Sequence, residues 1–211
     1  PLFRLPEHTA NAQRKGKRTA STARGHRSST IDTIATEGSG QYPEITSIGK
    51  QFGRIAIFRE WSFGRNAPAR LPQPSDGLND FLDRDCSNLG LVLNRLLREP
   101  AIRKKLVKYL QQLYKGLDDF HINVDPGTVQ VFLLEGDWAV PATRLSDGTL
   151  RYLCLLAILC HPTPPPMVCL EEPELGLHPD IIPTLAELMV DASSRTQLIV
   201  TTHSDLLVDE L

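Results

Sequence analysis

Two glutamates stand directly after a short apolar run in the last third of the sequence, where they could do chemistry. The run Met167–Leu170 is continuous, as expected of a strand buried in a parallel sheet, and Glu171 and Glu172 follow it. One carboxylate in that place can hold Mg²⁺, directly or through water, while its neighbour orients and deprotonates an attacking water. Two acids exposed in a loop would give the same pattern, so the pair alone does not establish such a site.

Two further segments could handle phosphate. Residues 146–148 (Ser-Asp-Gly) lead into an apolar helix predicted over residues 150–160. A serine hydroxyl, free backbone N–H groups and the positive end of the helix dipole together suit a phosphate group, although an ordinary helix cap uses the same residues. His203 follows a second predicted buried strand over residues 197–200. A histidine there can donate a hydrogen bond to a γ-phosphate or hold the attacking water.

The elements around these segments predict an α/β fold. Residues 167–170, 179–192 and 197–200 have the patterns of a strand, a helix and a strand, which form a βαβ unit. The polar residues then lie at the carboxyl ends of the strands, where open α/β sheets bind ligands. Upstream, the pattern predicts a strand over residues 54–58, a loop over 66–80, a helical pair over 89–97 and 100–117, and a small antiparallel β meander over 119–140.

The composition places the chain among ordinary globular proteins. Its 211 residues carry 23 basic and 25 acidic side chains, for a net charge of −2, and 41% are hydrophobic. No apolar run is long enough to span a membrane, and no basic-then-apolar signal peptide opens the chain. The four cysteines form no CxxC pair and no zinc-site spacing. We therefore expect reduced core thiols in a cytoplasmic protein.

The start of the chain differs from the rest. Residues 1–30 hold seven basic side chains, one acid and few large hydrophobic residues, so ordering them would bury little apolar surface. We expect residues 1–50 to be a basic, poorly ordered segment or linker, which could alternatively bind DNA. Residues 51–142 then hold the helical pair and the meander. Residues 143–211 hold the phosphate-binding candidates, the acid pair and His203.

In this order, the three segments resemble the heads of ABC-type ATPases. The segments LSDGTLR, VCLEEPELGLHP and LIVTTHS are most similar to the SMC/RecF/OLD-like family of predicted bacterial ATPases, known as AAA-15 or AAA-21. The likeness is specific over residues 143–211 and looser over residues 55–140. It implies a P-loop NTPase-like fold, here incomplete, in which a parallel sheet with flanking helices is accompanied by the meander and the helical pair.

The resemblance implies how nucleotide would be bound. Leu145–Gly148 matches the ABC signature, which makes Ser146, Asp147 and Gly148 nucleotide-binding residues. Two protomers of such a head sandwich ATP, so the complete head would be a homodimer whose signature acts on its partner's nucleotide. An attached region would sense DNA or a protein partner, with no membrane involved.

The resemblance also implies which residues act in hydrolysis, with ATP and Mg²⁺ as cofactors. Met167–Glu172 matches Walker B, and within it Glu171 falls at the acid associated with Mg²⁺ and Glu172 at the catalytic glutamate. Glu174–His178 matches the D-loop. His203 matches the switch histidine, which would be the second catalytic residue.

One motif of these heads, the Walker A sequence GxxxxGK[ST], does not occur in the chain. The nearest candidates, Gly16-Lys17-Arg18 and Gly49-Lys50-Gln51, lack the upstream glycine and the Ser/Thr. This P-loop supplies most of the grip on ATP. We therefore expect the chain to be the C-terminal portion of a head. It would be inactive alone and would convert ATP and water to ADP and phosphate once joined to a Walker A lobe.

Two alternatives remain open. The chain could be a non-catalytic half-head, an interaction module for a P-loop-bearing or DNA-associated partner. It could instead be a metal-dependent hydrolase whose cluster comprises Glu171, Glu172, Glu174 and His178. The proline and the glycine between these residues argue against the cluster, because they indicate a turning loop with diverging side chains.

Overall fold

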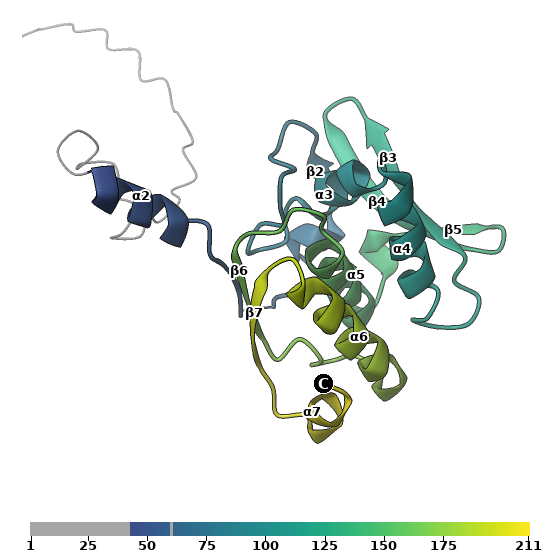
Figure 1. Ribbon diagram of the computed structural model, residues 1–211. Coiled ribbons are helices and arrows are strands. Elements are labelled where there is room, and N and C mark those ends of the chain that lie inside the picture. The colour runs from purple at the N-terminus through teal and green to yellow at the C-terminus, as the bar shows by residue number, and fades with distance from the viewer. Residues whose placement is uncertain (1–42, 60) are drawn as a thin grey trace, which may run out of the picture.

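The computed structural model describes residues 43–59 and 61–211 (Figure 1). Helix α2 (Pro43–Phe52) precedes the first strand, β1 (Ala56–Phe58), which begins two residues later than the sequence predicts. Helix α2 therefore crosses the boundary at residue 50 that the sequence predicts between the basic segment and the head. The division of the chain into three parts stays a prediction, and residues 1–42 of the basic segment lie outside the described residues.

The acid pair belongs to a three-stranded parallel sheet. Strands β6 (Met167–Glu171) and β7 (Gln197–Thr201) pair in parallel, and β1 pairs with the other edge of β6. Helix α6 (Ile182–Ser193) connects β6 to β7 after a short 3₁₀ turn, η3 (Pro179–Ile181). The predicted βαβ unit is therefore confirmed, and it places the ends of β6 and β7 side by side.

A second, antiparallel sheet confirms the predicted meander. It comprises β3 (Asp119–Asp125), β4 (Thr128–Glu135) and β5 (Trp138–Pro141), with β4 paired to both of the others. A further strand, β2 (Gln73–Pro74), pairs with the start of β4, within the segment predicted to be loop. The side chain of Gln73 is buried and accepts a hydrogen bond from the N–H of Gly90 at 2.7 Å, which fixes this short strand.

The helical pair is present, but its second helix is shorter than predicted. Helix α3 is Leu89–Leu96, and α4 is Pro100–Leu110. Leu113 and Leu117, which the apolar spacing assigned to the second helix, lie beyond its end. The chain closes into turns after Leu110 and bends at Gly116, whose φ of +96° suits glycine, before it enters β3. The two leucines still pack against the core, so core packing explains their apolar character although they lie outside a helix.

Helix α5 (Asp147–Leu159) lies between the two sheets and forms the centre of the core (Figure 1). It is buried on every side from Leu150 onward, as an all-round apolar helix requires. The last helix, α7 (Asp205–Glu210), is capped by Ser204. Across the described part of the chain, no helix is long and apolar enough to cross a membrane.

The basic face of α4 meets acidic side chains of α6. Lys105 forms an ion pair with Asp191, and Lys108 lies 3.5 Å from Glu187. Asp191 also accepts a hydrogen bond from Arg195 at 2.7 Å. Two of the basic side chains of α4 therefore pair with acids of α6.

Candidate functional site

The acid pair lies at the mouth of the parallel sheet. Glu171 is the last residue of β6 and pairs in register with Thr201 of β7. Glu172 follows the strand with a φ of +43°, a left-handed backbone conformation that residues with a Cβ rarely adopt. Its N–H donates to the carbonyl of Thr201 at 2.8 Å. This bond turns the chain at the end of β6 while keeping it against β7.

His203 reaches the same point from β7. Its Nε2 lies 3.4 Å from Oε1 of Glu172, and its side chain is 89% exposed, whereas that of Glu172 is 35% exposed. The structure therefore brings together Glu171, Glu172 and His203, which the sequence placed at the ends of neighbouring strands. Their roles in catalysis remain predictions.

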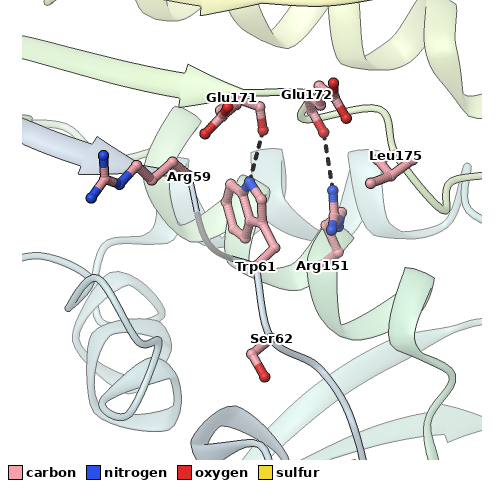
Figure 2. A pocket seen from close by; sticks show the side chains of 7 residues that line it. All are labelled: Arg59, Trp61, Ser62, Arg151, Glu171, Glu172 and Leu175. Carbon is pink, nitrogen blue, oxygen red and sulfur yellow. Dashed lines mark hydrogen bonds between the residues drawn. The ribbon is translucent and has the colours of Figure 1, made fainter.

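A cavity of about 640 Å³ opens beside the acid pair (Figure 2). Two of its lining side chains, Trp61 and Arg151, were missed by the sequence analysis. Trp61 donates from Nε1 to the carbonyl of Glu171 at 2.9 Å, and Arg151 donates from Nη1 to the carbonyl of Glu172 at 3.0 Å. The cavity is lined by Arg59, Trp61, Ser62, Arg151, Glu171, Glu172 and Leu175.

Arg151 is a buried cation of this cavity. Only 7% of it is exposed, and burial lowers the pKa of its guanidinium below the ordinary value, an effect that nearby Glu174 and Glu172 partly oppose. An arginine remains charged despite such a shift. The cavity therefore combines a fixed positive charge with two carboxylates, which suits a polar ligand that carries both phosphate and a bound cation.

The predicted signature turn caps its own helix. Oγ of Ser146 accepts the N–H of Thr149 at 3.0 Å and lies 2.8 Å from the Thr149 hydroxyl, so Ser146 is the N-cap of α5. The side chain is nevertheless exposed. At Gly148, a Cβ would lie 2.4 Å from the carbonyl oxygen of Gly176. The predicted signature turn thus packs directly against the predicted D-loop segment of the same chain.

Arg70 holds the segment that leads into the signature turn, and sequence reasoning missed it as well. It is buried at the end of the 3₁₀ turn η1 (Pro68–Arg70), from which it donates to the carbonyl of Phe63 at 3.1 Å and to Oδ1 of Asp147 at 2.6 Å. It also donates to the carbonyls of Ala142, Thr143 and Leu145. Asp147, which the sequence predicts to bind nucleotide, therefore forms an ion pair with Arg70 of the same chain.

The comparisons with known proteins agree with this arrangement. The family model AAA_21, described as "AAA domain, putative AbiEii toxin, Type IV TA system", matches residues 8–209. The chain belongs to this family. Membership confirms the predicted resemblance and the P-loop NTPase-like α/β fold, and it assigns the chain to the nucleotide-binding ATPase modules as a class. None of the curated proteins matches the AAA_21 chain.

Several solved structures are similar to parts of the AAA_21 chain. An SMC head bound to the C-winged helix domain of ScpA is 16% identical over 57% of the chain, with a TM-score of 0.46. A structure from work on ATP-driven dimerization and DNA-stimulated activation of SMC ATPases is 17% identical over 56%, with a TM-score of 0.43, and 77% of it is covered. An SMC head with a coiled coil and joint from Pyrococcus yayanosii is 19% identical over 57%, with a TM-score of 0.46 and 24% covered. The AAA_21 chain spans 38% of the length of the first.

The side chains of the predicted D-loop in the AAA_21 chain bind different partners. Glu174 accepts a hydrogen bond from the Thr202 hydroxyl, whereas His178 caps η3 by accepting the N–H of Asp180 at 3.3 Å. Within residues 43–59 and 61–211, no three His, Cys, Asp or Glu side chains gather as a metal cluster. Mg²⁺ in nucleotide sites is held by one or two carboxylates together with substrate phosphates. The exposed Glu171 side chain fits that arrangement better than the four-residue hydrolase cluster.

Proposed function

We propose that the chain is the C-terminal portion of an ABC-type ATPase head. Joined to a Walker A lobe, it binds and hydrolyses ATP at a dimer interface. The observation that carries the proposal is the meeting of Glu172 and His203, 3.4 Å apart, beside a cavity with a buried arginine. A half-buried carboxylate next to an exposed imidazole can accept a proton from water while the imidazole contacts phosphate.

Each polar group of the site has a distinct part in this proposal. Glu171 would hold Mg²⁺, which supplies neutralisation of phosphate charge when bound. The Glu172 carboxylate orients the attacking water and takes its proton. His203 is highly exposed, so its ring can approach a γ-phosphate without first leaving a buried position. This division of labour requires two adjacent acids, because one of them is committed to the metal.

The parallel sheet supports the proposed Walker A lobe. Ile57, Cys169 and Ile199 are register partners across its three strands, so their side chains lie on one face. Ile57 is 41% exposed and Ile199 is 46% exposed, whereas their strand neighbours on the other face pack against the core. Parallel sheets normally have both faces covered. A lobe packed on this row would cover the exposed face and could bring a P-loop to the carboxyl end of β6, where Glu171 lies.

The signature turn would act on the partner's nucleotide. Ser146 is exposed at the N-terminus of α5, where its hydroxyl, N–H groups and the helix dipole all favour an anion. Its bonds to the N–H and the hydroxyl of Thr149 use two of the three hydrogen-bonding positions of Oγ, and when the Thr149 hydroxyl donates, the Ser146 proton is left to donate to a phosphate. The turn therefore serves two purposes, since it starts the helix in its own protomer and presents a phosphate ligand outward.

Mixing two complete heads, each carrying one lesion, tests the proposal. A Ser146→Arg protomer spoils the site built on its partner, and a Glu172→Gln protomer spoils its own site. If both protomers are placed together, one site of the mixed dimer collects both lesions and the other keeps all its residues. We expect each parent variant to be inactive and the mixture to hydrolyse ATP.

Two controls make the outcome specific. Ser146→Asn keeps a good N-cap and therefore reports whether loss of the cap alone explains a defect. Glu172→Gln should still bind ATP and accumulate as a closed dimer in size-exclusion chromatography, because the amide keeps the shape but cannot accept a proton. A complete head in which Glu172→Gln hydrolyses ATP as fast as the wild type contradicts the proposed role. A head that associates with its partner but never hydrolyses ATP supports the non-catalytic half-head instead.

A further inference from the structure

Two side chains from different elements hold the backbone of the acid pair. Trp61, on the loop after β1, donates to the carbonyl of Glu171 at 2.9 Å. Arg151, in the second turn of α5, donates to the carbonyl of Glu172 at 3.0 Å. Figure 2 shows the two side chains standing next to each other below the pair, each reaching one carbonyl. We name Trp61 and Arg151 the carbonyl clamp.

The peptide that the clamp holds is in an unfavourable conformation. The φ of Glu172, +43°, brings its Cβ close to the backbone, and residues other than glycine adopt it only where their surroundings impose it. The N–H of Glu172 bonds to β7, and its carbonyl accepts from Arg151 and from the N–H of Leu175 at 3.1 Å. Relaxing this φ would rotate the carboxylate away from His203.

The clamp itself is rigid. Trp61 stacks between Phe58 and Phe63, with ring centroids 5.7 and 5.9 Å away. The Arg151 guanidinium lies 5.3 Å from the Trp61 ring and 5.7 Å from the Phe63 ring. Because the guanidinium and the aromatic rings stack, each restrains the rotation of the other, so both donors stay directed at their carbonyls.

We propose that Trp61 and Arg151 are positioning residues that impose the left-handed turn at Glu172 and thereby aim its carboxylate at His203 and the attacking water. This inference rests on the proposed function for its catalytic part. Its structural part, the restraint on the turn, stands on the contacts alone. The two parts can be measured separately.

The structural part is tested on the 211-residue chain by amide hydrogen exchange. Trp61→Phe keeps the ring stack but loses the N–H, and Arg151→Met keeps much of the aliphatic bulk but loses the guanidinium. Exchange at the amides of Glu172 and Leu175 should accelerate by about tenfold or more. These amides bond to the carbonyls of Thr201 and Glu172, and without the clamp the turn that aligns both bonds is no longer held. Arg151→Lys should restore part of the protection, because it keeps a donor without the planar stack.

Matched controls separate this effect from general loosening. Trp138→Phe changes a tryptophan that is 77% exposed at the β5 hairpin, and Arg98→Met changes an exposed arginine. Neither should alter exchange at the acid pair. Unchanged exchange in both Trp61→Phe and Arg151→Met, or an equal acceleration in the controls, overturns the inference. If Arg151→Met does not fold, Trp61→Phe and Arg151→Lys decide the question.

The catalytic part is tested in the complete head. We expect Trp61→Phe and Arg151→Lys to lower kcat by about tenfold or more, with KM within about twofold, because a misaimed base slows chemistry and leaves ATP binding intact. In a Glu172→Gln background the same changes should have no further effect on residual turnover. Two outcomes would overturn the catalytic part of the inference. In one, the variants lose ATP binding while kcat is unchanged, and in the other, kcat is undiminished although amide exchange is faster. A head whose wild type and Glu172→Gln turn over equally refutes the proposed function instead, and the exchange experiment still decides the clamp.

Discussion

Replacing Gly148 with alanine should destabilise the chain, even though alanine is the better helix former. Gly148 lies in the first turn of α5, where an added Cβ would be 2.4 Å from the carbonyl oxygen of Gly176 and 3.5 Å from its carbonyl carbon. Real Cβ atoms hardly ever approach another atom within 3.0 Å, so the backbone at Gly176 must move by at least ~0.6 Å. Gly176 is itself fixed in a left-handed turn with a φ of +77°.

The magnitude follows from two opposing terms. Alanine in place of glycine stabilises a helix by roughly 0.5–1 kcal/mol, and somewhat less near its end. Forcing a carbon against backbone that cannot rotate away costs about 1–3 kcal/mol. With a gain of about 0.5 kcal/mol at the helix end, we expect Gly148→Ala to lose about 0.5–2.5 kcal/mol net. For a domain of this size each kcal/mol lowers Tm by about 2–4 °C.

Urea denaturation of the 211-residue chain measures the change. The control is Gly64→Ala, because a Cβ at Gly64 has no neighbour within 4 Å and its stability should stay within ~0.5 kcal/mol of wild type. A Gly148→Ala variant as stable as wild type, or more stable, would refute the packing argument. Packing against Gly176 would then not explain why a glycine stands at position 148.

Three further outcomes are expected. The 211-residue chain alone should hydrolyse ATP negligibly, and a turnover of roughly 10 per second that disappears in Glu172→Gln would contradict this. Arg70→Met should lose at least ~2 kcal/mol in urea denaturation, because several buried carbonyls lose their donor, and the lysine variant should recover only part of that loss. Asp191→Asn should cost less than ~1 kcal/mol at neutral pH, since the pair is partly exposed. Although burial opposes the charge, hydrogen bonds from Arg195 and Lys105 hold the pKa of Asp191 below its ordinary value. The difference from wild type should therefore shrink once the pH falls below about 3.9, the ordinary value for Asp, and vanish only below the lowered pKa of the folded chain.

The sequence predicted the elements that carry strong periodicity. The strands of the βαβ unit and the meander were recognised because short apolar or alternating runs are bounded by turn residues. The meeting of Glu172 and His203 followed from the same reasoning, since parallel strands end at one edge. The end of α4 was misplaced because Leu113 and Leu117 continue the helical spacing, although they reach the core through turns.

The supports of the site could not be predicted in the same way. Trp61 and Arg70 donate hydrogen bonds to backbone carbonyls 72 to 110 residues away. Because every residue has a carbonyl, the type of the accepting residue does not reveal such a contact. The looser likeness to the family over residues 55–140 includes Trp61 and Arg70, but it assigned neither residue a role. Only the fold places Trp61 under β6. Arg151 was hidden for another reason, because it stands in an otherwise apolar helix whose pattern indicates only burial.

Helix α5 connects the two halves of the proposed site within one protomer. Its first residues form the signature turn, which packs Gly148 against Gly176, and its next turn carries Arg151, which holds the carbonyl of Glu172. A helix is stiff along its hydrogen-bonded axis, so a displacement at Ser146 moves Arg151 with it. Under the proposed function, a lesion at Ser146 would therefore disturb two sites, the partner's by direct contact and its own through α5. For this reason the mixed-dimer experiment needs the Ser146→Asn control, which preserves the start of α5 and isolates the contact made across the interface.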